Sequence, residues 1–206
     1  MVLTKSETTI ATILSAAEER FVRRAYADVS MRDLAEAAEV TTGALYHHFP
    51  SKEQLYYAML TAYLGRVRQV SLEAIPASGS CRDKLRALTR VFLALPAEQR
   101  GLMGLVRRDS HVFAGRTRQG IVRAYQATVP DLVEQVVREG IQRGELKRHD
   151  PRWLAWTYVA IVETALTDYA EHRLGGLDQR LDAALGLFLE GAAAPAAAVT
   201  GVTYAD

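Results

Sequence analysis

Residues 29–53 read Val29-Ser-Met-Arg-Asp-Leu-Ala-Glu-Ala-Ala-Glu-Val-Thr-Thr-Gly-Ala-Leu-Tyr-His-His-Phe-Pro-Ser-Lys-Glu53, a pattern that predicts two short helices around a tight turn. Ser30 is placed to cap the first helix, with Asp33 as the acidic partner of a capping box. The chain turns at residues 39–40, and Thr41 is placed to cap the second helix. Two short helices joined in this way are typical of a helix-turn-helix, which makes DNA the first candidate partner.

Each of these two predicted helices has an apolar side and a polar side. Leu34 and Ala37 are expected to face inward on the first helix, where a small residue lets two helices cross closely. The expected apolar contacts of the second helix come from Ala44, Leu45 and Phe49. The residues left on the outer side are Thr42, Gly43, Tyr46 and His47.

The composition is that of a globular protein with a real core. The chain has 206 residues, of which 49% are hydrophobic and 24% are charged. A single cysteine, Cys81, excludes an intramolecular disulfide and a multi-cysteine metal site, and it fits a reducing compartment. The N-terminal residues lack the basic run and long apolar run of a secretion signal, so we expect a cytoplasmic protein. No cofactor, metal site or membrane partner is predicted.

Charge limits how the chain could bind DNA. The net charge is only +1, and residues 1–52 hold six basic residues against seven acidic ones. Proteins that coat DNA without regard to sequence rely on a strongly basic surface. If this region binds DNA, a few placed groups must do so.

The rest of the chain shows helical periodicity and no strand alternation of useful length, so the predicted fold class is all-α. One amphipathic helix is expected over 9–24, where it braces the helix-turn-helix. A long connecting helix is expected from 52 to about 74, capped by Ser51, and a loop at 76–80 follows it. The remaining predicted helices lie at 85–95, 102–109, 117–143 with Pro130 as a kink or break, 153–166 after Asp150-Pro151, and 177–189.

Two of these helices carry more apolar surface than one packed face requires. Between Trp153 and Leu166 the polar residues are Thr157, Glu163 and Thr164 alone, so this helix must be buried on more than one side. The run is too short and too interrupted for a membrane span of about 20 apolar residues. Together with the last helix it predicts a subunit interface, and the alternative is burial inside one subunit. The interface candidates are Trp153, Leu181, Leu185 and Phe188.

The segments Ser30-Met-Arg-Asp-Leu-Ala and Gly43-Ala-Leu-Tyr-His-His-Phe-Pro-Ser-Lys-Glu53 resemble the DNA-binding domain of the tetracycline-repressor (TetR) family of bacterial regulators. The resemblance covers about the first quarter of the chain. This chain has Ala25 and Glu39 at two places where the family often has glycine. A left-handed backbone at Glu39 would cost roughly 1 to 2 kcal/mol.

The resemblance implies a three-helix DNA-binding bundle over residues 1–52 and a helical ligand-binding and dimerisation domain over 53–192, followed by a loose Ala-rich tail at 193–206. It implies a homodimeric regulator, a repressor released from a palindromic operator by a small molecule. The physics of the groove places the start of the second short helix nearest the base edges, with phosphate contacts around it. The expected DNA contacts are Ser30, Arg32, Thr41, Thr42, Gly43, Tyr46, His47 and Lys52, the last as a phosphate clamp at a helix N-terminus.

The implied effector is an apolar or aromatic small molecule in a pocket of the C-terminal helices. The candidate lining residues are Phe92, Met103, His111, Phe113, Tyr125, Trp156 and Glu163. Glu163 is notable because a carboxylate in so apolar a helix needs a partner. That partner could be an internal arginine, the other subunit or a cationic ligand.

Two other functions compete with this interpretation. A helical enzyme would have to use His111 with Asp109, or Glu163 with His172, but no nucleophile motif, phosphate loop or metal-ligand spacing accompanies them. A helix-turn-helix module could instead bind protein and no DNA, which the outward polar cluster of the second short helix argues against. The prediction is therefore a DNA-binding regulator with no catalytic residues.

Overall fold

The computed structural model of the chain describes residues 4–95, 104–106, 108–109 and 111–190, and all regular structure in these ranges is helical. The predicted all-α class is confirmed. Met103 and the predicted tail lie outside the described residues. The helices are α1 (Lys5–Arg23), a 3-10 turn (Tyr26–Asp28), α2 (Met31–Ala37), α3 (Thr42–His48), α4 (Lys52–Ala74), α5 (Cys81–Ala94), α7 (Gly115–Thr128), α8 (Pro130–Gln142), α9 (Pro151–Ala165), α10 (Asp168–Leu174) and α11 (Leu177–Glu190).

The N-terminal helices start where the sequence places their caps. The Ser30 hydroxyl accepts from the Asp33 amide at 3.1 Å, and the Asp33 carboxylate accepts from the Ser30 amide at 2.8 Å, so the predicted capping box is present. Thr41 caps α3 by accepting from the Ala44 amide at 3.1 Å. The turn between α2 and α3 holds Glu39 at φ 54°, the left-handed conformation that the missing glycine would have eased.

The core of this first bundle differs in one detail from the expectation. Leu34 and Leu45 are buried as predicted, but Ala37 is only half-buried. The small residues that lie fully inside on the α2 side are Ala35 and Ala38. The inward face of α2 is therefore rotated from position 37 to its neighbours, because the helix repeats every 3.6 residues and Leu34 fixes its phase.

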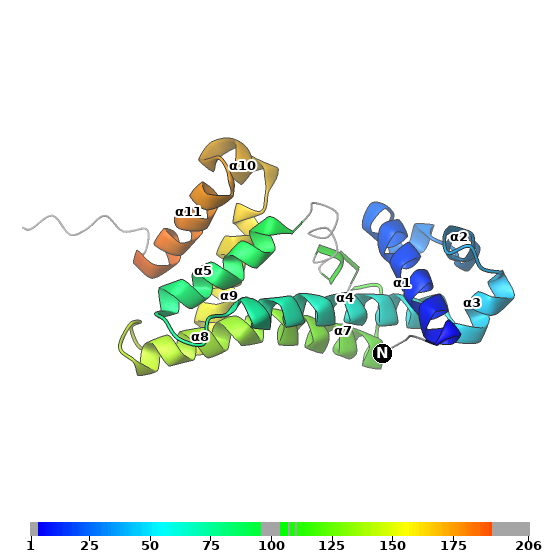
Figure 1. Cartoon of the computed structure of the whole chain (residues 1–206), viewed down its shortest axis with the longest axis horizontal. Coiled ribbons are helices and arrows are strands. Elements are labelled where there is room, and N and C mark those ends of the chain that lie inside the picture. Colours follow the sequence, from blue (N-terminus) through cyan, green and yellow to red (C-terminus); the bar gives the residue numbers. More distant parts are fainter. Residues whose placement is uncertain (1–3, 96–103, 107, 110, 191–206) are drawn as a thin grey trace, which may run out of the picture.

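Helix α4 connects the two ends of the molecule (Figure 1). Its first half packs on α1, and its second half packs on α5 and α7. Figure 1 shows α1, α2 and α3 gathered at one end of α4, while α5, α8, α9, α10 and α11 form a bundle toward the other end. Ser51 caps α4 through the Gln54 amide at 3.2 Å, as predicted.

The C-terminal bundle follows the predicted helices, with two refinements. Pro130 separates α7 from α8, and Asp150 caps α9 through the Trp153 amide at 2.7 Å. The short helix α10, capped by Thr167, was not predicted. In the described part of the chain, no helix is long and apolar enough to span a bilayer.

Candidate nucleic-acid interface

The outer face of α3 is polar and exposed, as the sequence predicts. Thr42, Gly43, Tyr46 and His47 are all exposed, and Tyr46 keeps 48% of its surface accessible. Leu45, between them, is fully buried and fixes the helix on the bundle. A large aromatic side chain held this far out contributes little to the core. Its position suits contact with a partner surface instead.

Gly43 has no visible role in the fold. A Cβ atom added there would have its nearest neighbour, the Thr41 hydroxyl oxygen, at 4.0 Å, which is ordinary van der Waals distance. Its backbone conformation also lies outside the left-handed region that favours glycine. A glycine that neither packing nor backbone geometry requires is consistent with close approach of the backbone to something outside the chain.

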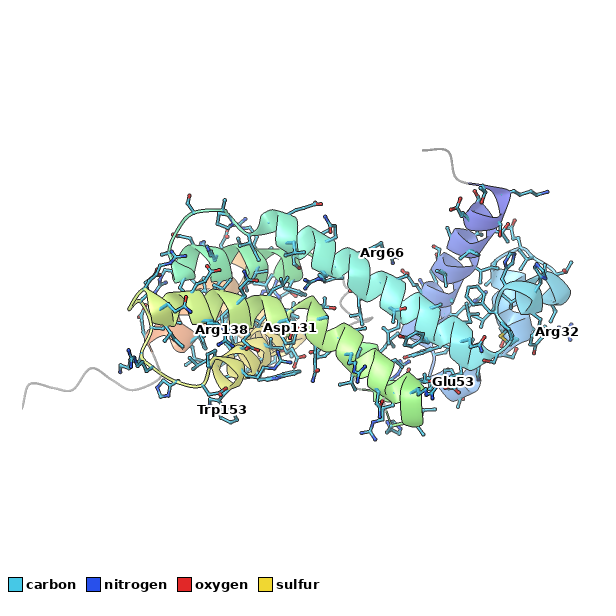
Figure 2. The ribbon with its side chains drawn as sticks, turned by 90° about the horizontal axis from the view of Figure 1, so that it is seen from below. Arg32, Glu53, Arg66, Asp131, Arg138 and Trp153 are labelled. Carbon is cyan, nitrogen blue, oxygen red and sulfur yellow. The ribbon has the colours of Figure 1, made fainter. Side chains whose placement is uncertain are left out.

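The hydroxyls of the two capping residues differ in what they have left to offer. The Ser30 hydroxyl donates to the Asp33 carboxylate at 2.8 Å, so its proton is already engaged inside the capping box. Thr41 uses its oxygen as an acceptor, which leaves its proton for an outside acceptor such as a phosphate. Arg32 is exposed near the start of α2 at the far end of the molecule (Figure 2).

Lys52 holds the chain between α1 and α2 from within. Its ammonium donates to the backbone carbonyls of Tyr26 at 2.8 Å and Val29 at 2.9 Å, and it lies 4.3 Å from the centre of the Tyr26 ring. An ammonium has three N–H donors, so one remains for a phosphate. The first amides of α4 also lack partners within the helix. The predicted phosphate contact of Lys52 stays a prediction, and the structure adds a second, positioning role.

A polar junction joins the C-terminal part of the chain to α1 and α4. Asp109 is 3% exposed, and its carboxylate accepts from the Tyr56 hydroxyl at 2.8 Å and from the Arg108 guanidinium, also at 2.8 Å. Arg108 donates further to the backbone carbonyls of Phe21 at 2.9 Å and Arg24 at 3.1 Å. Burial, together with the neighbouring Asp109 carboxylate, raises the pKa of Tyr56 well above its ordinary value. The segment before α7 is therefore tied to the end of α1 that leads into the helix-turn-helix.

An aromatic cluster surrounds this junction, and it corrects two predictions. Phe113 packs on Tyr26 and Tyr56, with ring centres 4.9 Å and 5.0 Å apart, so it belongs to the junction and not to a ligand pocket. His111, two residues earlier, is exposed. Both residues follow a segment that leaves the C-terminal bundle, and periodicity alone cannot show which core a side chain joins.

The one well-enclosed apolar cavity described in the C-terminal bundle lies between α5, α7, α8 and α9 and has a volume of about 40 Å³. Phe92, Tyr125 and Glu163 line it, as predicted. Trp156 lies beside it, with its ring 6.1 Å from that of Tyr125. The Tyr125 hydroxyl donates to Glu163 at 3.1 Å, a partner that none of the three sequence-based expectations named.

The side chains proposed for an enzyme are not arranged as catalytic pairs. The carboxylate of Asp109 is held by Tyr56 and Arg108, and Glu163 accepts from Tyr125. The ring of His172 contacts the backbone carbonyl of Asp168 at 2.7 Å on an exposed helix. Within the described ranges, no group of three or more histidine, cysteine or acidic residues could hold a metal ion.

Two of the predicted interface residues are wrong. Leu181 and Leu185 are 0% exposed in the single chain, where α11 packs on α5 and α9, so they cannot lie on a free surface. Phe188 is half-buried, with its ring 4.8 Å from that of Tyr158. Trp153 is 70% exposed and projects outward from α9 (Figure 2). Exposed apolar side chains that the prediction missed include Tyr169 and Leu187.

Two family models match the chain. Residues 13–59 match a family of bacterial regulatory proteins, the tetR family, and residues 78–169 match a tetracyclin repressor-like C-terminal domain. The transcriptional regulator TtgR of Pseudomonas putida is 30% identical over 168 residues, covering 75% of this chain and 78% of that protein. The transcriptional repressor KstR2 of Rhodococcus jostii is 26% identical over 187 residues, covering 89% and 90%.

The fold is also found in solved structures. The transcriptional regulator FadR from Bacillus subtilis, solved in complex with stearoyl-CoA, superposes with a TM-score of 0.74 at 21% identity. The match covers 88% of this chain and 98% of that one. At this identity the likeness establishes the arrangement of helices and leaves the ligand of this chain to be argued from its own residues.

Proposed function

The chain belongs to the TetR family of transcriptional regulators, and from that membership we propose that it is a homodimeric repressor released from a palindromic operator by a small molecule. The observation that carries the DNA-binding part is the exposed polar face of α3, held on a buried core and containing a glycine that the fold does not need. The repressor role is supported by KstR2, a relative named as a repressor.

The DNA contacts follow from the position of each side chain on α3. Thr42 and Gly43 lie at the start of the helix, where the end of a recognition helix meets base edges. Threonine can hydrogen-bond a base or place its methyl group against thymine. Tyr46 and His47, one turn later, reach a phosphate or an outer base. Since residues 1–52 carry no net positive charge, affinity depends on these contacts being made twice by a dimer.

The dimer contact is assigned to the exposed side of α9. Trp153, Ala160 and Thr164 are exposed and Thr157 is half-buried, and their spacing places them along one side of the helix. Small residues at three of these positions let a second helix approach closely. Two reading helices bound to neighbouring major grooves must be about 34 to 36 Å apart, so the dimer geometry sets whether both can bind.

A route for the effector signal runs from the cavity to the helix-turn-helix. A cavity of about 40 Å³ holds only a few water molecules, so an organic ligand must move its walls. One wall is α7, which carries Tyr125 and starts directly after Phe113 and the Arg108–Asp109 junction. Displacement of α7 would therefore reach the carbonyls of Phe21 and Arg24 through Arg108.

The test begins with selection of bound sequences from a random pool of duplex DNA, using the full chain. We expect a palindrome, and affinity for it should fall with salt by a log-log slope of about 0.9 for each neutralised phosphate. Arg32→Ala should weaken binding, whereas Arg82→Ala should not, because Arg82 lies on α5 and is paired with Glu190 at 2.6 Å. The two variants change net charge equally, so the comparison removes any effect of overall charge.

The operator then tests the mode of action. A reporter driven by a promoter that overlaps the palindrome should be silenced by the chain. Failure to select any sequence, or equal loss of affinity in both arginine variants, would contradict the proposed DNA surface. Activation of the reporter would contradict the repressor role while leaving DNA binding intact.

A further inference from the structure

The polar groups on the cavity wall are mostly engaged with the protein itself. The Thr89 hydroxyl donates to the Leu85 carbonyl at 2.9 Å, and the Tyr158 hydroxyl contacts both Thr89 and that same carbonyl. Both side chains are buried. These hydroxyls therefore fix α5 against α9, and the remaining surface that they present to the cavity is apolar.

Glu163 is different, because it is the one charged residue among the described residues that line the cavity. It is half-buried on α9, and one of its oxygens accepts from the Tyr125 hydroxyl at 3.1 Å. An ionised carboxylate has about four acceptor sites and no donor. One tyrosine hydroxyl occupies one of them, so the group can accept further donors. A ligand that meets it favourably brings an N–H donor or a positive charge.

Aromatic rings flank the carboxylate. The Tyr125 ring lines the cavity, and the Trp156 ring lies 6.1 Å from it at an angle of 34°. The Trp156 ring already faces a cation, since the Arg152 guanidinium lies 5.6 Å from its centre. The face of an aromatic ring attracts positive charge, most strongly where water is excluded. A carboxylate next to aromatic rings in an apolar wall is a combination that recognises organic cations.

We propose that the effector is a compact organic cation, an amine or quaternary ammonium with an apolar body, whose charged group binds Glu163 and the Tyr125 ring. This rests on the proposed function, because it assigns a ligand class to the effector cavity. The same carboxylate disfavours an anionic group at this position. The chain thus differs in expected ligand chemistry from what its similarity of fold to a stearoyl-CoA complex would suggest.

A matched set of probes tests the charge directly. Benzyltrimethylammonium and neopentylbenzene have nearly the same shape and differ in the charge of one central atom, and 3-phenylpropionate supplies an anion of similar size. Binding to the full-length chain is measured by ligand-detected NMR and by the shift in melting temperature, and release from the selected operator is measured in parallel. We expect the cation to bind at least about tenfold more tightly than its neutral analogue, and the anion to bind least.

Substitution of the carboxylate provides the second arm. Glu163→Gln keeps the size of the side chain and an acceptor for Tyr125 but removes the charge, so it should abolish the preference for the cation and leave the neutral probe unchanged. Glu190→Gln, on the surface of α11, is the control with the same charge change and should retain the preference. If Glu163→Gln does not fold, Tyr125→Phe keeps the ring and the carboxylate, and it should retain the preference for the cation.

The outcomes separate this proposal from the proposed function. Equal binding of the cation and the neutral probe, or a preference that persists in Glu163→Gln, would overturn the cationic class while leaving the cavity as the effector site. Failure of all three probes to bind would overturn it too. Loss of the operator palindrome in the selection experiment would instead count against the regulator itself, whatever the probes do.

Discussion

The reading surface on α3 and the cavity between α5, α7, α8 and α9 relate to the core of the protein in opposite ways. The residues proposed to read DNA are exposed and add little to packing, while their neighbour Leu45 supplies the burial. In the cavity, Phe92 and Tyr158 are buried and serve as wall and core at once. Function and stability are therefore separable at the surface and combined in the cavity.

This difference indicates how the two regions can change. A substitution on α3 can alter the DNA sequence that is read without loss of stability. A substitution in the cavity changes the ligand and the packing together, because buried side chains leave a void or a clash when their volume changes. The following predictions test how sharp this separation is.

The largest effect is expected at a residue that the sequence assigned to the wrong surface. Leu181→Asp places a charge in the core between α5, α9 and α11, which should cost at least about 4 kcal/mol and abolish cooperative unfolding. Trp153→Glu, on the exposed side of α9, should stay folded by circular dichroism but elute as a monomer. A folded Leu181→Asp protein would show that the α11 core is not as described.

A smaller effect, confined to DNA binding, is expected for Gly43→Ala. The fold has room for the added methyl group, so the melting temperature should be unchanged or slightly higher. Operator affinity should fall by about 1 to 3 kcal/mol if the backbone lies against the base edges. Gly65→Ala is the control, since an added Cβ on α4 also has open space but lies away from α3. Unchanged operator affinity in Gly43→Ala would remove Gly43 from the reading surface.

The junction should lie between these two extremes. Tyr56→Phe removes one donor from the buried Asp109 carboxylate and should lower the free energy of unfolding by about 1 to 2 kcal/mol. The same change at the exposed Tyr46 should have almost no effect on stability. Urea denaturation of both variants provides the measurement. Equal stability of the two would mean that the hydrogen bond between Tyr56 and Asp109 contributes nothing.

The smallest effect concerns two identical capping boxes, one in each part of the molecule. Hydrogen bonds from the backbone and side chain of Ser30 lower the pKa of Asp33, and the Ser80 hydroxyl and amide lower that of Asp83. Because each pKa is lower in the folded state, the stabilisation is present above the ordinary aspartate pKa and is lost as the pH falls through the lowered value. NMR titration of the two carboxyl groups should give values below the ordinary range for both. An ordinary pKa at either position would mean that its box is open in solution.

The helix-turn-helix was predictable because its determinants are local. The caps of α2, α3 and α4 join residues three apart in the sequence, and the left-handed turn at Glu39 follows from the short connection between two helices. The exposed face of α3 then follows from the phase of one buried leucine. Each of these features is fixed by fewer than ten consecutive residues.

The junction and the true interface could not be predicted in this way. Tyr56 and Asp109 are 53 residues apart, and nothing near either one indicates that they meet. An apolar stripe shows that Leu181 and Leu185 are buried, but it does not distinguish burial by the same chain from burial by a partner. For the same reason Phe113 could be assigned to a core but not to the right one.

The length of α4 has a mechanical consequence. A helix of 23 residues is about 34 Å long, so a tilt of about 5° at one end carries the other end sideways by roughly 3 Å. In a twofold-symmetric dimer the two ends move in opposite directions, and the separation between them changes by twice that amount. The helix acts as a gear, in which a movement smaller than a bond length beside the ligand becomes a mismatch of nearly two base pairs at the DNA.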